Sequence, residues 1–137
     1  MTRNTKILFL LLAIIQAFVA FGALPVGALF IIKPDGSAVG MSVSLLAGSP
    51  FKDFLIPGIA LFFFNGILHL INAVLSFLKH KNAPLIGVIL GAGLIIWIIV
   101  QIYAIGFNNF LQPLFFFIGN LELIISIILI KKDTNFQ

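Results

Sequence analysis

Two side chains in this sequence could carry acid–base chemistry inside segments that are otherwise apolar. His69 and Glu122 are the only histidine and the only acidic residue that lie well inside those segments, away from their ends. A carboxyl group and an imidazole that meet can act as acid and base, hold a proton or a polar ligand, or join two helices by a hydrogen bond. The chain has no cysteine and only two histidines, so we expect no metal, disulfide or cofactor.

These two residues occupy matching positions in a stretch that occurs twice. Residues 61–71 read LFFFNGILHLI, and residues 114–124 read LFFFIGNLELI. Just upstream of each copy, FKDFLIP at 51–57 is echoed by FNNFLQP at 107–113. The matched Phe, Gly and Pro positions indicate an internal duplication of helix pairs, although so apolar a sequence also produces matches by chance.

The composition predicts an integral membrane protein. Of the 137 residues, 61% are hydrophobic and 9% are charged, whereas a soluble domain carries about 25% charged residues. So little charge would leave a soluble domain without a polar surface, and the length suffices for one bundle. The net charge of +4 does not indicate nucleic-acid binding, because most of the basic residues flank the apolar segments.

Four apolar stretches predict an all-α membrane protein with a bundle of four transmembrane helices. Each stretch is long enough to cross a hydrocarbon core of about 30 Å. Residues 1–137 would form a single transmembrane domain, and residues 33–49 its outer loop. The expected helices cover residues 7–32, 50–78, 84–105 and 111–130.

Turn and cap residues refine these boundaries. Lys33-Pro-Asp-Gly36 has the composition of a tight turn, and the alternation of apolar and small residues from Val39 to Leu45 predicts a short extended segment. Ser49 followed by Pro50 is typical of a helix N-cap and first helical position. The basic start of the first apolar run also resembles a signal peptide, but the length of the run favours a retained helix.

The distribution of basic residues predicts the topology. Four helices put both termini on one side, and that side holds six basic residues against two on the other. The positive-inside rule then places both termini in the cytoplasm. We expect a multi-pass protein of a bacterial cytoplasmic membrane, surrounded by membrane lipids. The six residues are Arg3, Lys6, Lys79, Lys81, Lys131 and Lys132.

Helix geometry brings the polar residues into one layer. At about 1.5 Å per residue, Gln16, His69 and Glu122 lie roughly 13.5–15 Å from the basic residues of the terminal side. At about 100° per residue, Asn65, His69 and Asn72 share one face of their helix. We therefore take Glu122, His69, Asn65, Asn72 and Gln16 as the candidate ligand- or proton-binding residues.

Small residues indicate where helices pack closely. Gly87 and Gly91 form a G-x-x-x-G step, and Gly66 and Gly119 occupy matching places in the repeat. Residues without a side chain let two backbones approach. We expect these four glycines to lie at helix–helix contacts.

Two motifs resemble those of a family of small four-helix bacterial integral membrane proteins. One is LAGSPFKDFLIPG at 46–58, of the form LAGSPFxDFLIPG, and the other combines Trp97-Ile-Ile-Val-Gln101 with LQP at 111–113. The resemblance spans roughly residues 20–130, and it implies the four-helix fold and the membrane location. It brings no activity with it, and it assigns no role to His69 or Glu122.

Three functions are compatible with this pattern. The first is a non-enzymatic membrane protein that acts through helix packing around the polar layer, in a homo-oligomer or with another membrane protein. The second is a binder or carrier of a small amphiphile, lipid or proton that uses Glu122 and His69. The third is an intramembrane enzyme with these two residues as acid and base. The sequence offers no nucleophile, metal or cofactor motif for an enzyme, which favours the first.

Overall fold

The computed structural model describes residues 1–107 and 109–136, with side chains placed as far as Lys132 in the last helix. Asn108, in the second copy of the echoed segment, lies outside the described residues. η1 and η2 are 3-10 helices and η3 is a π-helix. The elements are α1 (Arg3–Ile32), η1 (Ser37–Val39), η2 (Val43–Leu46), α2 (Leu55–Ala60), η3 (Leu61–Leu68), α3 (His69–Phe77), α4 (Ala83–Ile105) and α5 (Leu111–Phe136).

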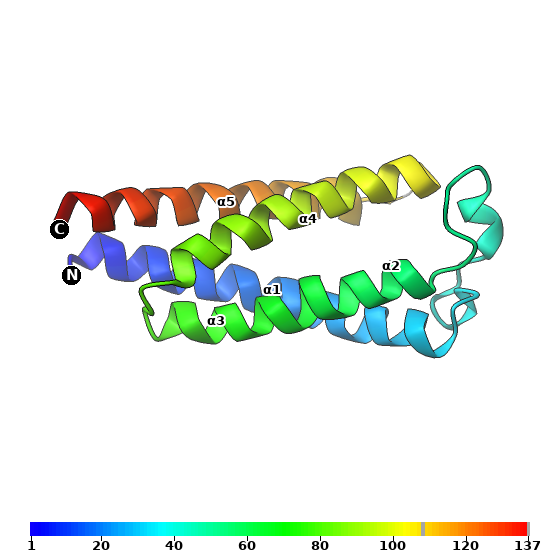
Figure 1. The fold of residues 1–137 in the computed structure, drawn as a ribbon, viewed down its shortest axis with the longest axis horizontal. Helices are drawn as coiled ribbons and strands as arrows, with labels where there is room; N and C mark the ends of the chain where they lie inside the picture. Colours follow the sequence, from blue (N-terminus) through cyan, green and yellow to red (C-terminus); the bar gives the residue numbers. More distant parts are fainter. Residues whose placement is uncertain (108, 137) are drawn as a thin grey trace.

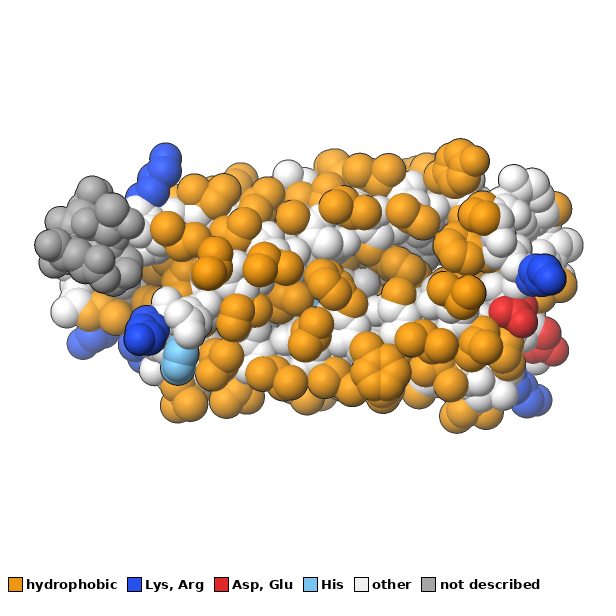
Figure 2. All heavy atoms as spheres, in the orientation of Figure 1, with side chains coloured by type: hydrophobic (Ala, Val, Ile, Leu, Met, Phe, Trp, Pro, Cys, Tyr) orange, Lys and Arg blue, Asp and Glu red, His pale blue; other side chains and the backbone are white. Residues whose placement is uncertain are grey.

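Four helical segments are long and apolar enough to cross a membrane, as the sequence predicts. Their apolar side chains cover the middle of the molecule in Figure 2, whereas charged side chains gather at its two ends. A surface of this kind suits a hydrocarbon surrounding. The segments are Arg3–Ile32, Leu55–Phe77, Ala83–Ile105 and Leu111–Lys132.

The long helices pack as two adjacent pairs. α1 packs along α2, η3 and α3, and α4 packs along α5, while α1 also contacts α5. Figure 1 shows both termini at one end of the molecule, together with the connection between α3 and α4. The connection that holds η1 and η2 lies at the opposite end.

The second long helix begins at Leu55, so the predicted start at Ser49 and Pro50 is wrong. The Ser49 hydroxyl donates to the Leu46 carbonyl at 2.7 Å and accepts from the Phe51 amide at 3.2 Å, which closes a turn rather than a helix. Phe54 takes the N-cap position without a side-chain cap, and the Asp53 carboxylate before it accepts from the Leu55 amide at 3.0 Å. Ser49 and Asp53 are both acceptable cap types, and the sequence alone does not rank them.

The connection between α1 and α2 is wound into turns, so the predicted extended segment from Val39 to Leu45 is also wrong. Gly36 and Gly40 have φ angles of +82° and +75°, which reverse the chain. The Ser42 hydroxyl accepts from the Ser44 amide at 3.3 Å and starts η2. The predicted turn is present, since the Gly36 amide donates to the Lys33 carbonyl at 3.1 Å.

The remaining helix ends lie close to the predicted ones, with extensions at polar residues. α1 begins at Arg3 rather than residue 7, because Thr2 caps it by accepting from the Thr5 amide at 3.2 Å. α4 begins at Ala83, one residue before Pro84, and α5 begins at residue 111 as predicted but continues past residue 130. A boundary placed where the apolar residues stop omits the polar turns that extend α1 and α5.

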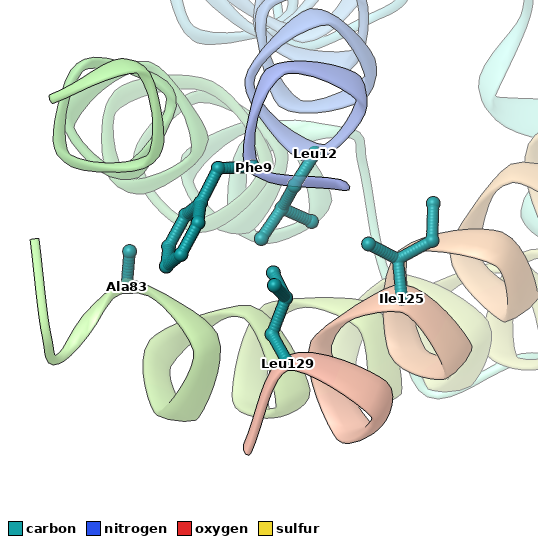
Figure 3. Packing of buried hydrophobic residues seen from close by; sticks show 5 residues of the cluster. All are labelled: Phe9, Leu12, Ala83, Ile125 and Leu129. Carbon is teal, nitrogen blue, oxygen red and sulfur yellow. The ribbon is translucent and has the colours of Figure 1, made fainter. Parts of the chain in front are cut away.

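Apolar contacts hold the helices together at both ends and along the middle. Figure 3 shows the cluster near the termini, where side chains of α1 and α5 meet Ala83 at the start of α4. Phe30, Leu46 and Phe54 form a second cluster that packs the connection between α1 and α2 against α1. The rings of Phe30 and Phe54 stack with centroids 4.9 Å apart. The cluster in Figure 3 consists of Phe9, Leu12, Ala83, Ile125 and Leu129.

Candidate functional site

A layer of polar side chains lies buried between the long helices. Each is 0–1% exposed, although the surrounding surface is apolar. In a helix that spans a membrane, an ionisable group near the middle costs at least about 2.5–3.5 kcal/mol unless it finds partners. The layer comprises Gln16 of α1, Asn65 of η3, His69, Asn72 and Ser76 of α3, and Glu122 and Ser126 of α5.

His69 and Glu122 meet directly. Nε2 of His69 lies 3.0 Å from Oε1 of Glu122, and Nδ1 of His69 lies 3.2 Å from the Phe64 carbonyl oxygen. A carbonyl oxygen only accepts, so Nδ1 carries a hydrogen and donates to Phe64. One further proton is then shared between Nε2 and Oε1. Imidazolium beside carboxylate and imidazole beside carboxylic acid both satisfy this geometry, and both give the pair a net charge of zero.

The π-helix η3 supplies the acceptor for His69. Backbone hydrogen bonds in a π-helix span five residues, and such turns are frequent at functional sites. Phe64 lies five residues before His69, and its carbonyl receives the ring hydrogen. The corresponding stretch in the second copy of the repeat is part of the α-helix α5. The two copies therefore differ in backbone as well as in the exchange of His69 for Glu122.

Gln16 joins the pair to a third helix. Its Nε2 donates to Oε2 of Glu122 at 3.0 Å, and its Oε1 accepts from the Ser76 hydroxyl at 2.8 Å. The hydrogen bonds thus run without a gap from Ser76 through Gln16 and Glu122 to His69. Because they cross α1, α3 and α5, they fix the relative heights of these helices. Ser76 was not among the candidates, although it shares the helix face of His69.

The two candidate asparagines stay outside this chain of bonds. Nδ2 of Asn72 donates to the Ala83 carbonyl at 3.1 Å and so ties α3 to the first turn of α4. Oδ1 of Asn72, Oδ1 of Asn65 and the Ser126 hydroxyl have no hydrogen-bond partner. An unpartnered buried polar group costs about 1–3 kcal/mol. These three atoms are therefore the places where a further polar group would be stabilised.

The four candidate glycines lie at close helix contacts. A Cβ at Gly91 would stand 2.9 Å from the Leu123 amide nitrogen and 3.1 Å from the Gly119 carbonyl, so α4 and α5 touch through their backbones there. A Cβ at Gly66 would lie 2.7 Å from the Leu24 side chain. Gly87 faces the hydroxyl of Ser126 and leaves room for the polar layer.

A cavity of about 400 Å³ adjoins the polar layer on the side away from the termini. It lies among α1, η3, α4 and α5, and Asn65 stands in its wall. His69 and Glu122 do not line it. Apolar side chains form most of the lining, including Phe18, Trp97 and Phe115, and the polar ones include Asn65, Gln101 and Gln112.

Comparison with known protein families, with curated proteins and with solved structures found no match. The family resemblance noted above stays a prediction.

The polar layer and its adjoining cavity fit the binding of a small molecule better than acid–base catalysis. His69 and Glu122 are 0% exposed and bond to each other, so neither can reach a substrate in this conformation. The part of the chain that the structure describes holds no group of three His, Asp or Glu side chains that could bind a metal ion. Asn65 is also buried, but it is one of the residues that line the cavity, and its Oδ1 has no hydrogen-bond partner.

Proposed function

We propose that this protein is a multi-pass membrane protein that binds one small amphiphile in the cavity among α1, η3, α4 and α5. The observation that carries this proposal is Asn65, which lines the cavity and whose Oδ1 is buried without a hydrogen-bond partner. Binding sites for small molecules are mostly apolar, have volumes of about 300–1,000 Å³ and use few polar groups. The cavity of about 400 Å³ fits that description.

The chemistry of Asn65 defines the ligand class. A carbonyl oxygen accepts a hydrogen bond, so the ligand must donate one. The aromatic and aliphatic lining favours an apolar body behind that donor. A hydroxyl group on an aliphatic or flat ring skeleton meets both conditions. The ligand hydroxyl would lie one turn from His69, with its body toward Trp97.

Trp97 makes the proposal testable by fluorescence. It is the only tryptophan in the chain and lines the cavity. Protein in phosphatidylcholine nanodiscs is titrated with a bromine-labelled long-chain alcohol and with the bromoalkane of the same length. We expect the alcohol to quench Trp97 at a lower concentration than the alkane, because only the alcohol donates to Asn65.

An asparagine pair provides the matched control. Asn65→Leu should remove the preference for the alcohol, whereas Asn120→Leu should keep it. Asn120 lies outside the cavity, and its amide donates to the Phe116 carbonyl at 2.8 Å. Equal quenching by alcohol and alkane in the unmodified protein would show simple partition into lipid and would refute the proposal.

The polar layer itself favours a second, structural role. The bonds among Ser76, Gln16, Glu122 and His69 are direct and lie inside one chain. They support the helix-packing function, in which the layer holds the helices in register. Their burial also means that a partner chain would meet the apolar outer faces rather than these groups.

We also propose that both termini face the cytoplasm of a bacterial cell. Six basic residues at the terminal end against two at the other support this topology. The chain has no cysteine, so single cysteines can report it. Ser44→Cys in intact cells should react with a membrane-impermeant maleimide, and His80→Cys should react only after permeabilisation. The reverse pattern would invert the topology.

A further inference from the structure

A second hollow lies at the end of the molecule that bears both termini. Its volume is about 560 Å³, and α1, the connection between α3 and α4, and α5 all contribute to it. Three lysines line it, and apolar side chains shared with the cluster of Figure 3 form part of its wall. The lysines are Lys79, Lys81 and Lys132, and the apolar residues include Phe9, Pro84 and Leu129.

Lys79 has a backbone conformation that a lysine rarely adopts. Its φ angle is +58°, the only positive φ of a non-glycine residue in the described chain. Its amide donates to the Ser76 carbonyl at 3.0 Å, and the His80 amide donates to the Leu75 carbonyl at 2.9 Å. These two bonds form a Schellman motif, whose left-handed position glycine fills at lower free energy. The helix ending thus explains the conformation but not the choice of lysine.

Topology alone does not account for this lysine either. The positive-inside rule needs basic residues near the membrane edge, and neighbouring positions in the same connection would meet it without a positive φ. Lys79 instead joins two other lysines around one hollow. Among the side chains that the structure describes, no acidic group lies within ion-pair distance of these three. In sequence, one acidic residue, Asp133, follows Lys132.

We propose that this hollow binds a phosphate group, and that the phosphate is that of an anionic phospholipid. Three lysine ammonium groups match a phosphate anion, and basic pockets between membrane helices hold lipid head groups in this way. Phe9, Pro84 and Leu129 provide an apolar wall for the start of an acyl chain, which inorganic phosphate lacks. The site is independent of the amphiphile cavity, because the two share no lining residue.

Lipid competition tests the assignment. The full-length protein is placed in nanodiscs of equal parts phosphatidylglycerol and phosphatidylcholine, and native mass spectrometry counts the lipids that stay bound. We expect at least one phosphatidylglycerol to be retained in preference to phosphatidylcholine. Lys132→Ala should lower that retention about fivefold. Lys131→Ala removes the same charge from the neighbouring residue, which is exposed and outside the hollow, and should change it less.

Lys79→Gly separates binding from folding. Glycine suits the left-handed position, so this variant should melt at the same or a higher temperature while it also loses about fivefold in phosphatidylglycerol retention. Lys52→Gly, at the opposite end, also exchanges a lysine for glycine but does not touch the hollow, so it should leave phosphatidylglycerol retention unchanged. Equal loss in Lys131→Ala and Lys132→Ala, or no preference for phosphatidylglycerol, would overturn the proposal. Displacement of the lipid by millimolar inorganic phosphate would overturn its assignment to a lipid.

Discussion

The Glu122 carboxylate lies 3.0 Å from the imidazole of His69, although 53 residues separate the two in sequence. Each belongs to a different copy of the repeated stretch, and each is the only ionisable group of its copy. The contact joins α3 to α5, and Gln16 extends it to α1. One carboxyl group therefore links three of the long helices.

The direct bond between His69 and Glu122 should appear as an interaction energy. In a double-mutant cycle with His69→Ala and Glu122→Ala, we expect a coupling of about 0.5–3 kcal/mol. Unfolding in mixed micelles of increasing SDS content provides the free energies. Ser126 and Asn120 on α5 do not bond to each other, so this pair should give additive effects. Additivity of the His69 and Glu122 effects would contradict the bond.

The hydrogen bonds that the side chain at residue 122 can form should matter more for stability than its charge. Glu122→Gln can still accept from Gln16 and can donate to Nε2 of His69, so we expect a loss of about 1 kcal/mol. Glu122→Ala leaves Gln16 and His69 without that partner and should cost about 3–5 kcal/mol. The same unfolding measurement compares them. If Glu122→Gln were as destabilising as Glu122→Ala, the site would require the carboxyl group's proton or charge itself.

The backbone contact between α4 and α5 should make Gly91 sensitive to one methyl group. Gly91→Ala places a Cβ 2.9 Å from the Leu123 amide nitrogen, which neither backbone can yield to without a shift. We expect a loss of about 1–3 kcal/mol. Gly22→Ala is the matched control, because its Cβ would meet only Phe115 at an ordinary 3.5 Å. That variant should be neutral or slightly stabilising, since alanine favours the helix.

Acid should loosen the connection between α1 and α2 through Asp35. The backbone amide of Ser37, then its hydroxyl, and also Lys33 hold the pKa of Asp35 below its ordinary value of 3.8. A lowered pKa in the folded state means that this contribution is present above pH 3.8 and is lost as the pH falls through the folded value. Amide exchange of residues 33–54 between pH 2.5 and 5 should show it.

Two variants check the origin of this acid effect. Asp35→Asn should abolish the pH dependence of exchange in the connection. Ser37→Ala removes the hydroxyl bond of 2.7 Å but keeps the backbone bond of 2.9 Å, so it should move the transition to higher pH without removing it. An unchanged transition in Asp35→Asn would assign the effect to another group.

Regular helix geometry predicts most of the polar layer. The rise per residue predicts that Gln16, His69 and Glu122 lie at one depth. In the structure Glu122 forms hydrogen bonds with both of the others. The expected face of Asn65, His69 and Asn72 also points inward. This holds despite the π-helix, because a four-residue step returns to nearly the same face in both helix types.

Local competition between short-range hydrogen bonds explains what the sequence did not predict. Ser49 and Asp53 are both residue types that cap helices, but each makes a turn bond before the helix, which begins at Leu55 after Phe54. Asn65 and Asn72 look alike on a helical wheel, but only Asn72 has a carbonyl of α4 within reach of its amide. No periodicity in the sequence predicts that Leu61–Leu68 forms a π-helix rather than an α-helix. The duplication of helix pairs stays a prediction.

The shared proton has a consequence for how this protein would respond to voltage. Its transfer between Glu122 and His69 moves charge by less than the 3.0 Å that separates the two heavy atoms. That distance is about a tenth of a hydrocarbon core of ~30 Å. Moving one elementary charge across the whole membrane at 100 mV changes its free energy by about 2.3 kcal/mol. The transfer between Glu122 and His69 covers about a tenth of that distance, so the same potential changes its free energy by at most about 0.2 kcal/mol. In the proposed membrane position, the resting potential of a cell would leave the proton's place almost unchanged.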